Sequence, residues 1–523
     1  MQSEEKPPNM KGMGHDHVPA CIQHSRKRTY LMKIAQWMEQ SGVAFGTSGA
    51  RGLVTAMTDA VCFAYTVGYL KHLATLGEFA PGTQVAVAGD LRPSTPRILR
   101  ACAAAIECLH GVPVFCGFVP TPALCLHAFA RGIPSLMVTG SHIPADRNGI
   151  KFNRARGEFL KTDEAAMREQ DAVLPAGWFN ADGELVKMLE LPAITDVVPD
   201  YVARYRDFFG PDALSGLTLG IYQHSAVGRD VLMLVVEALG AKAVPLGRSD
   251  TFMPVDTEAV RPEDAELARE WASDGTLDAI LTTDGDSDRP LLADRHGNWL
   301  RGDVLGILAA RFLNAAAVTT PVSSNTALEQ AGFARDIRRT RIGSPFVVAA
   351  MTEAAAAGLV PSVGYEANGG FLLASDVHHE NRTLVALPTR DSVLPMICAL
   401  VAARRVGTDL AGLVATLPPR FTLSDRLVAM PTEKSRARIA ALGDSPSAGA
   451  AALGFVATCG ELSHVDRTDG LRMTFANGEI IHLRPSGNAP ELRVYVEADS
   501  PERAGNLLQT GLGAVSAWRD EAS

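Results

Sequence analysis

Residues 83–90 read TQVAVAGD, and this short apolar run is typical of a buried β-strand. A helix is expected over 94–111, because Ser94 is a favourable first residue and Gly111 a favourable stop. A second strand, a second helix and a third strand are expected in that order, at 112–118, 121–132 and 133–139. Strands that alternate with helices in this way predict βαβ units and a mostly parallel sheet.

The alternation returns twice further along the chain. Strands are expected at 217–225, 241–246, 277–283, 318–323 and 359–363, and helices from about residue 228 and over 344–357. From about residue 418 the pattern changes to alternating, antiparallel-type strands at 471–476, 479–484 and 492–498, with Asn477-Gly478 as a hairpin turn and a final helix from 500. The chain is therefore predicted to be an α/β protein with three consecutive α/β domains, built on mixed or parallel sheets, and a C-terminal α+β domain.

We place the four domains at 42–195, 196–300, 301–416 and 417–523, after a leader of residues 1–41. The leader is polar and contains a His15-Asp16-His17 cluster, whose side chains are possible metal ligands. Chain termini are usually mobile, so a flexible leader is the favoured interpretation and a metal site is the alternative.

The composition excludes several classes of protein. The 523 residues include 49 Lys and Arg against 58 Asp and Glu, a net charge of −9, whereas a dedicated nucleic-acid-binding protein would be basic. The eight cysteines form no CxxC pair, and residues 1–40 contain no long apolar signal-peptide region. The longest nearly apolar stretch, 393–403, is too short to span a membrane. We expect a cytoplasmic protein that binds neither nucleic acid nor membrane.

Functional loops in parallel sheets follow the carboxyl ends of strands, and the first such loop is 139–151, TGSHIPADRNGIK. Ser141 is a candidate nucleophile, with His142 beside it and Lys151 beyond a predicted Asn148-Gly149 turn. A nucleophilic serine needs a base that a third group orients, and adjacent loop residues seldom face each other. A hydrogen-bonded loop serine therefore remains the alternative interpretation.

The second loop, 284–289, reads DGDSDR after an apolar strand. Asp284, Asp286 and Asp288 can converge on one hard cation, for which Mg²⁺ or Ca²⁺ are suitable. Arg289 and Arg295 stand where an EF-hand loop needs Gly and Glu, which argues against that type of calcium site. A solvated acidic turn is the alternative, and the buried strand before the loop disfavours it.

Two later loops suggest binding of a sugar and of a phosphate. In 364–370, GYEANGG, Glu366 and Asn368 offer an acceptor and a donor for neighbouring hydroxyls. In 484–491, RPSGNAPE, a glycine-containing turn with two guanidiniums nearby makes a phosphate cradle, and its residues are Arg484, Ser486, Gly487, Asn488 and Arg493. An ordinary turn is the alternative for each loop, and no GK[ST] motif marks the second as a Walker A loop.

A weaker signal lies at 45–52, FGTSGARG, where Arg51 can reach an anion. No predicted strand precedes this stretch, so it is not interpreted as a dinucleotide-binding fingerprint. Asp90 and Arg92, at the end of the first strand, either brace this loop or form a structural ion pair.

The four loops, in this order, resemble the α-D-phosphohexomutase superfamily, the phosphomannomutases and phosphoglucomutases, from about Gly42 to the C-terminus. The resemblance implies a heart-shaped, four-domain molecule with a central cleft. It implies that Ser141 is the phosphoryl carrier and, with Asp284, Asp286 and Asp288, binds Mg²⁺. Sugar and phosphate binding are assigned to Arg289, Glu366, Asn368, Arg484, Ser486, Gly487 and Asn488, and Lys151, His142 and Arg51 are the candidates for proton transfer.

Four positions depart from the common pattern of this family, namely Ile143, Ser344, Asn368 and Asn488-Ala489, where Asn, His, Ser and Thr-Glu are usual. They cluster on the side of the site that recognises the substrate, so they bear on sugar preference rather than on phosphotransfer.

The implied reaction interconverts hexose 6-phosphate and hexose 1-phosphate through a phosphoserine and a 1,6-bisphosphate, which also serves as activator. Mannose phosphates are the expected substrates. A phosphoglucomutase or dual-specificity enzyme is the alternative, because contacts at O3 and O4 do not separate sugars that differ at O2. A non-catalytic phosphosugar-binding protein is the alternative from another class, and the presence of Ser141 with all three aspartates argues against it. The oligomeric state is left open.

Overall fold

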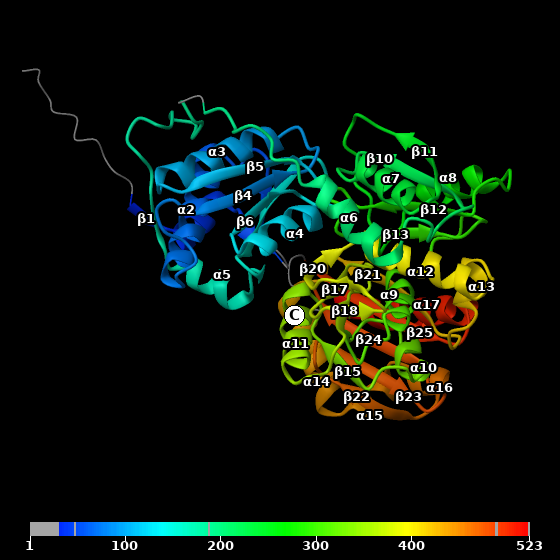
Figure 1. Cartoon of the computed structure of the whole chain (residues 1–523). Coiled ribbons are helices and arrows are strands. Elements are labelled where there is room, and N and C mark those ends of the chain that lie inside the picture. The colour runs from blue at the N-terminus through cyan, green and yellow to red at the C-terminus, as the bar shows by residue number, and fades with distance from the viewer. Residues whose placement is uncertain (1–30, 47–48, 187–188, 487–489, 521–523) are drawn as a thin grey trace, which may run out of the picture.

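The computed structural model describes residues 31–46, 49–186, 189–486 and 490–520, and these form four sheets of four or more strands. Each sheet belongs to one unit of the chain, and the units follow one another in sequence (Figure 1). The first and second units lie side by side at the top of Figure 1, and the third and fourth lie below them.

The first unit has a mixed sheet in the order β2-β3-β7-β6-β4-β5, with β8 on β7. Its strands are β2 (Ala44–Phe45), β3 (Ala50–Leu53), β4 (Gln84–Gly89), β5 (Val112–Phe118), β6 (Ser135–Val138), β7 (Arg147–Arg154) and β8 (Gly157–Glu158). Its helices are α2 (Asp59–Thr75), α3 (Thr95–Cys108), α4 (Thr121–Arg131) and α5 (Lys161–Arg168). The predicted parallel core is confirmed, because β4 pairs in parallel with both β5 and β6.

The predicted Asn148-Gly149 turn is wrong, because both residues lie inside β7. The close packing around them explains the difference. The Asn148 amide donates to the hydroxyls of Ser94 and Thr95, at 2.8 and 3.1 Å. A Cβ at Gly149 would lie 2.6 Å from the Ala50 carbonyl oxygen, so glycine serves here for a close strand approach rather than for a turn.

Part of the expected leader is folded. Strand β1 (Leu31–Lys33) pairs antiparallel with β9 (Asp171–Val173), and α1 (Ile34–Ser41) follows it directly. Ile34 is fully buried, and its Cγ1 lies only 2.4 Å from the position that a Cβ at Gly68 would take. Residues 31–41 are therefore part of the first unit, which corrects the expectation of a flexible leader over 1–41. The His15-Asp16-His17 cluster lies outside the described residues.

The second and third units also have mixed sheets, in the orders β11-β10-β12-β13 and β15-β14-β16-β17-β20. The second contains α6 (Val198–Phe209), β10 (Thr218–His224), α7 (Arg229–Ala238), β11 (Lys242–Arg248), α8 (Pro262–Ala272), β12 (Ala279–Thr283) and β13 (Pro290–Ala293). The third contains α9 (Gly302–Phe312), β14 (Ala317–Pro321), α10 (Ala327–Ala331), β15 (Asp336–Thr340), α11 (Ser344–Ala356), β16 (Ser362–Tyr365), β17 (Phe371–Leu373), the β18–β19 hairpin (Val377–His379, Arg382–Leu384), β20 (Leu387–Asp391), α12 (Val393–Arg405) and α13 (Leu410–Val414).

The fourth unit is an antiparallel sheet in the order β21-β25-β24-β23-β22. Its elements are β21 (Phe421–Val428), α14 (Thr432–Asp444), α15 (Pro446–Ala452), α16 (Phe455–Cys459), β22 (Leu462–Asp466), β23 (Leu471–Phe475), β24 (Ile480–Pro485), β25 (Glu491–Ala498) and α17 (Pro501–Asp520). Strands β23 and β24 pair antiparallel across Asn477-Gly478, which confirms the predicted hairpin.

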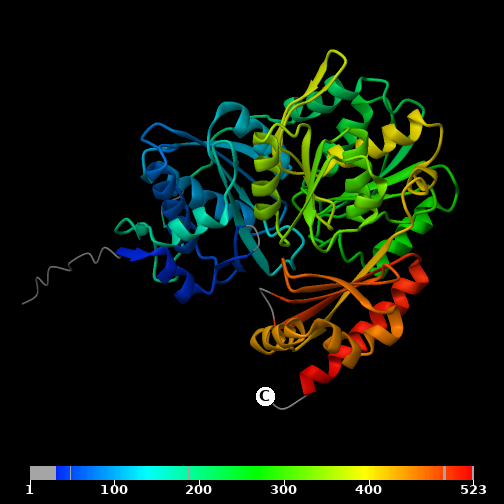
Figure 2. The same ribbon diagram turned by 90° about the horizontal axis from the view of Figure 1, so that it is seen from below.

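One hydrophobic cluster extends through the first three units, the first unit has a second large cluster of its own, and the fourth unit has another. One buried cluster contains Leu124 of the first unit, Leu281 of the second and Leu394 of the third. The cluster of the fourth unit, which includes Met473 and Val494, is separate from it. Figure 2 shows the fourth unit, orange to red, below the other three. Among the helices that the structure describes, none combines the length and the apolar character needed to cross a membrane.

Candidate active site

The loop that carries Ser141 is held by a buried arginine. It begins where β6 ends, and Ser141 itself is buried and has a φ of +55°. The Arg92 guanidinium donates to four backbone carbonyls of the loop, those of Ser141, Ile143, Pro144 and Arg147, at 2.6–2.9 Å. Asp90 accepts from Arg92 Nε at 3.2 Å and from Thr139 Oγ1 at 2.7 Å. Asp90 and Arg92 therefore brace the serine loop and not the Arg51 loop.

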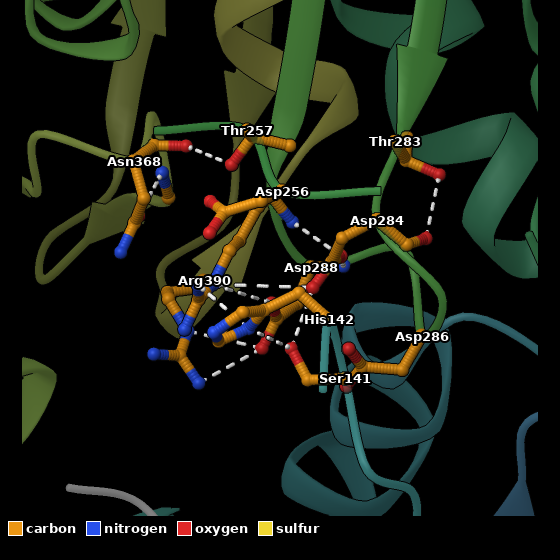
Figure 3. A network of polar contacts seen from close by, with 12 residues as sticks. Ser141, His142, Asp256, Thr257, Thr283, Asp284, Asp286, Asp288, Asn368 and Arg390 are labelled. Carbon is orange, nitrogen blue, oxygen red and sulfur yellow. Dashed lines mark hydrogen bonds and ion pairs between the residues drawn. The ribbon is translucent and has the colours of Figure 1, made fainter. Parts of the chain in front are cut away.

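Ser141 lies against the aspartate loop of the second unit (Figure 3). Its Oγ donates to Asp284 Oδ2 at 2.6 Å. A Cβ at Gly285 would lie 2.7 Å from the Ser141 carbonyl oxygen, so only glycine permits this approach. Thr121, at the start of α4, donates its hydroxyl to Asp286 Oδ2 at 2.6 Å. Side chains from the first two units thus meet at one point, although 143 positions separate Ser141 from Asp284.

The three aspartates can hold a cation. Asp284, Asp286 and Asp288 are buried, and each offers one oxygen within 4.8 Å of the others. Asp286 Oδ1 and Asp288 Oδ1 are buried with no hydrogen-bond partner among the described residues. Buried carboxylate oxygens without donors are the ligands that a hard divalent cation prefers, so this arrangement fits Mg²⁺.

Strong electrostatic forces act within the cluster. Burial raises the pKa of Asp284 to about 8, and the charges of Asp286 and Asp288 add to that shift. Burial alone would also raise the pKa of Asp288, but Arg390, Lys151 and Arg289 together hold it below its ordinary value. Lys151 Nζ donates to Asp286 Oδ2 and to Asp288 Oδ2, both at 2.5 Å.

His142 contacts both Ser141 and the arginine that follows the aspartates. Its Nδ1 lies 3.3 Å from Ser141 Oγ and accepts from Arg289 Nη1 at 3.0 Å. The expectation that these loop neighbours do not face each other is therefore wrong. The Arg289 charge, together with burial and Arg51, lowers the pKa of His142 to about 2, so the ring is neutral.

Arg51 lies on β3, and its guanidinium has no hydrogen-bond or ion-pair partner among the residues that the structure describes. Burial and the charges of Arg289 and Arg390 lower its pKa to about 10. A guanidinium surrounded by other cations and lacking a carboxylate of its own is suited to bind an anion.

The loop between β16 and β17 joins the second and third units. Glu366 Oε2 accepts from Arg390 Nη1 at 3.2 Å. Arg390 also contacts Asp288, and Figure 3 shows these two side chains together. The Asn368 carbonyl accepts from Thr257 Oγ1 of the second unit at 2.7 Å. The two residues proposed to recognise the sugar are thus held beside the aspartate loop.

The fourth unit reaches the same cleft. Arg484 and Arg493 are paired in register on β24 and β25. A cleft of about 410 Å³ is lined by Arg493 and Arg426 of this unit, by Arg261 of the second and by His142 of the first. Arg484 Nε donates to Asp469 Oδ2 at 2.8 Å, and Ser486 is buried. Gly487 and Asn488 lie outside the described residues.

Sequence reasoning missed several residues of the site, among them Thr121 and Arg390, and linked Arg92 to the wrong loop. Thr121 begins a helix, and Arg390 is the next-to-last residue of a strand, LPTRD, which has no glycine to mark a functional loop. Strand-end position was the available signal for Arg390, because the strand before it is buried.

Comparison with protein families identifies the chain. Three phosphoglucomutase/phosphomannomutase models match: the alpha/beta/alpha domain I at residues 42–171, the alpha/beta/alpha domain III at 301–421 and the C-terminal domain at 428–510. A phosphomannomutase of Sinorhizobium fredii is 44% identical over 476 residues, which cover 91% of this chain and 99% of the relative. The chain therefore belongs to the phosphoglucomutase/phosphomannomutase family of the α-D-phosphohexomutase superfamily.

Solved structures share this fold. A putative phosphomannomutase from Thermus thermophilus superposes with a TM-score of 0.69 at 22% identity, covering 92% of this chain and 99% of that one. An Aspergillus fumigatus N-acetylphosphoglucosamine mutase in complex with GlcNAc-6P and magnesium superposes with a TM-score of 0.57 at 14% identity, covering 93% and 99%. The sequence-based expectations of fold and enzyme class are confirmed: the chain is a hexose phosphate mutase of the phosphomannomutase type.

Proposed function

We propose that this enzyme transfers the phosphoryl group through Ser141, converting mannose 6-phosphate and mannose 1-phosphate into each other by way of the 1,6-bisphosphate. The observation that carries the proposal is the 2.6 Å contact of Ser141 Oγ with Asp284, inside a buried cluster of carboxylates and cations. Glucose phosphates are the alternative substrates, because recognition at O3 and O4 does not distinguish the two sugars.

Asp284, Asp286 and Asp288, with the Ser141 oxygen, are proposed to hold Mg²⁺. The unpartnered carboxylate oxygens support this, as does the magnesium in the Aspergillus mutase of similar fold. Bound there, the cation would draw negative charge from the transferring group, which phosphoryl transfer requires. A hexose 1,6-bisphosphate is proposed as the activator that first phosphorylates Ser141.

The remaining residues bind and orient the substrate. Arg289 and Arg51 are placed to neutralise the transferring phosphoryl group, since each lies close to the Ser141 loop and to other cations. Glu366 and Asn368 would accept from and donate to the sugar hydroxyls. Arg484 and Arg493, with Ser486, Gly487 and Asn488, would bind the phosphate that is not reacting, and that binding energy orients the sugar.

Proton transfer is assigned to Lys151 rather than to His142. The attacking hydroxyl must lose a proton and the leaving oxygen must gain one. His142 is neutral and accepts from Arg289, so we propose that it orients the Arg289 guanidinium. The Lys151 ammonium, held between Asp286 and Asp288, would give a proton to the leaving oxygen, and the neutral amine that remains would accept the proton of the attacking hydroxyl.

Intact-mass measurement tests the phosphoserine. Incubation with mannose 1,6-bisphosphate should add about 80 Da to the wild-type chain and nothing to Ser141→Ala, because one phosphoryl group is gained at that hydroxyl. Ser463→Ala, at an exposed position of β22, is the matched control and should still gain it. Mass gain in Ser141→Ala, or turnover without any phosphoenzyme, would refute the proposal. Binding of hexose phosphate without turnover would favour the non-catalytic alternative.

Metal dependence gives a second test. Asp286→Asn should lower turnover at least about 100-fold and raise the Mg²⁺ concentration for half-maximal activity, because one of the proposed ligands loses its charge. Asp250→Asn, at an exposed carboxylate of the same unit, should change neither quantity. Initial rates across a magnesium titration measure the turnover and the Mg²⁺ concentration for half-maximal activity. Running the titration with mannose 1-phosphate and with glucose 1-phosphate also shows which sugar the enzyme prefers. An unchanged rate in Asp286→Asn would remove this loop from the mechanism.

A further inference from the structure

Four consecutive residues at the end of β20, Thr389 to Ser392, connect the third unit to the other two units of the shared core. Thr389 Oγ1 donates to Glu158 Oε1 of the first unit at 2.9 Å. Asp391 accepts from the Tyr201 and Tyr205 hydroxyls of α6 at 2.7–3.0 Å, and Ser392 Oγ donates to the Ser287 carbonyl of the aspartate loop at 2.7 Å. This segment is therefore held on both sides of Arg390.

Arg390 makes the most direct connection. Its side chain is only 3% exposed. Nε donates to Asp288 Oδ2 at 3.0 Å, and Nη2 lies 2.9 Å from the same oxygen. Nη1 donates to Glu366 Oε2 at 3.2 Å. One planar guanidinium thus holds a proposed metal ligand and the proposed sugar acceptor at the same time.

The aliphatic part of Arg390 also packs on the sugar-binding loop. A Cβ at Gly370 would lie 2.5 Å from Arg390 Cδ and 2.8 Å from Cγ. The backbone of the sugar-binding loop at Gly370 therefore packs directly against the aliphatic part of the Arg390 side chain. Because the contact is tight and buried, a shift of Arg390 would move Glu366 relative to Asp288.

We infer that Arg390 is a positioning residue that couples the sugar-binding loop to the aspartate loop, and so fixes the sugar hydroxyl relative to the phosphoryl group on Ser141. The inference rests on the proposed roles of Ser141 and Glu366. A misplacement of about 1 Å in such a reaction costs on the order of 100-fold in rate. The planar guanidinium of Arg390 matters for this coupling. A lysine ammonium carries its charge at one point and cannot hold two carboxylates in a fixed plane.

A double-mutant cycle with Arg390→Gln and Glu366→Gln tests the coupling through steady-state kinetics with mannose 1-phosphate, Mg²⁺ and activator. Arg390→Gln should lower kcat about 100-fold and change KM less than about 3-fold, because the fourth unit still binds the phosphate. When Glu366 is already replaced by Gln, adding Arg390→Gln should lower kcat less than about 5-fold, because the ion pair that links Arg390 to the sugar-binding loop is already lost. Arg390→Lys should lower kcat about 10-fold.

The controls separate coupling from folding. Arg382→Gln removes another arginine of the third unit that bonds to the second, through the Phe208 and Phe209 carbonyls, and should keep turnover within about 2-fold. If Arg390→Gln does not fold, the cycle is run with Arg390→Lys. Independent, multiplicative losses in the cycle, full activity of Arg390→Lys, or a loss confined to KM would overturn the inference. If wild-type protein forms no phosphoserine, the proposed function fails instead, and the two failures are distinguishable.

Discussion

Arg92 illustrates how a single residue can support a functional loop. Its side chain is completely buried, and it bonds to four backbone carbonyls of the loop that carries Ser141. Its guanidinium also lies 3.9 Å from the centre of the Phe252 ring of the second unit. Among the described residues, Asp90 is the only carboxylate in direct contact with the Arg92 guanidinium. Most of the N–H groups of Arg92 therefore donate to backbone carbonyls.

We predict that Arg92→Lys lowers both stability and turnover. A lysine has three donors on one nitrogen and cannot reach the four carbonyls, so loop oxygens would stay buried without donors. The expected cost is about 3 kcal/mol, with turnover reduced on the order of 100-fold because Ser141 would be less well held. Thermal unfolding and initial rates measure these effects.

Arg154→Lys is the matched control for this prediction. Arg154 pairs with Glu78 on the same unit but is 35% exposed, so its loss should cost less than about 1 kcal/mol and leave the rate unchanged. Equal effects of the two substitutions would contradict the proposed role of Arg92.

Residues whose chemistry depends on a local motif could be predicted from sequence. Asp284, Asp286 and Asp288 follow a buried strand at alternate positions, and Ser141 follows another. The partners of Arg390 could not be predicted, although its place near a strand end was a signal, because Asp288 and Glu366 lie 102 and 24 positions away. Long-range ion pairs leave no local pattern, and only the fold brings them together.

At the level of elements, the predicted strands match observed strands to within a few residues, whereas the short apolar strands β13 and β17 were not predicted. The sequence failed where tertiary contacts override local turn propensity, as in β7. Asn-Gly favours a turn in isolation. In the folded chain, however, β7 lies between β3 and β6, and its ladder hydrogen bonds to both outweigh that preference.

Gly149 gives a direct test of this packing. In Gly149→Ala the new Cβ would lie 2.6 and 2.8 Å from the carbonyl oxygens of Ala50 and Thr139, so neighbouring strands must move. We expect a loss of about 1–3 kcal/mol in stability and a clear loss of turnover, since the serine loop starts at Thr139. Gly157→Ala is the control, because nothing lies within 4 Å of its Cβ position. Equal melting temperatures for the two variants would contradict the prediction.

Strand β24 contains a histidine that should make stability depend on pH. His482 is buried, its Nε2–H donates to the Asp469 carbonyl at 2.6 Å, and Nδ1 has no hydrogen-bond partner among the described residues. Burial lowers its pKa to about 4. The unfolded chain therefore binds the proton first, at a pKa near 6.5.

The stabilisation from neutral His482 is thus complete above about pH 6.5 and is lost as the pH falls toward 4, by about 3 kcal/mol in total. Urea unfolding at about pH 7 and about pH 4.5 should show a smaller acid-induced loss in His482→Gln than in wild type. His464→Gln, at an exposed position of β22, should behave as wild type. An identical pH dependence for all three proteins would refute the assignment.

At the scale of the whole molecule, the division of the core matters for the reaction. The first three units share one buried cluster, which keeps Ser141, the aspartates and Glu366 in fixed relation. The fourth unit, with the proposed phosphate-binding arginines, packs around a separate cluster. In the proposed reaction the bisphosphate must turn over within the site so that its other phosphate faces Ser141, and motion of one unit against a rigid remainder allows this.

The separate core of the fourth unit predicts that this unit unfolds in a different step from the cluster that the first three units share. Met473 and Leu281 are both fully buried, the first in the core of the fourth unit and the second in the shared core. Met473→Ala and Leu281→Ala should each lower one transition by about 2–5 kcal/mol, because each leaves a cavity in only one core. Hydrogen exchange read by mass spectrometry in increasing urea assigns each transition to its peptides. If both substitutions shifted the same peptides equally, the chain would unfold as one cooperative unit, and motion of the fourth unit would need to disrupt the shared core, contrary to what the packing indicates.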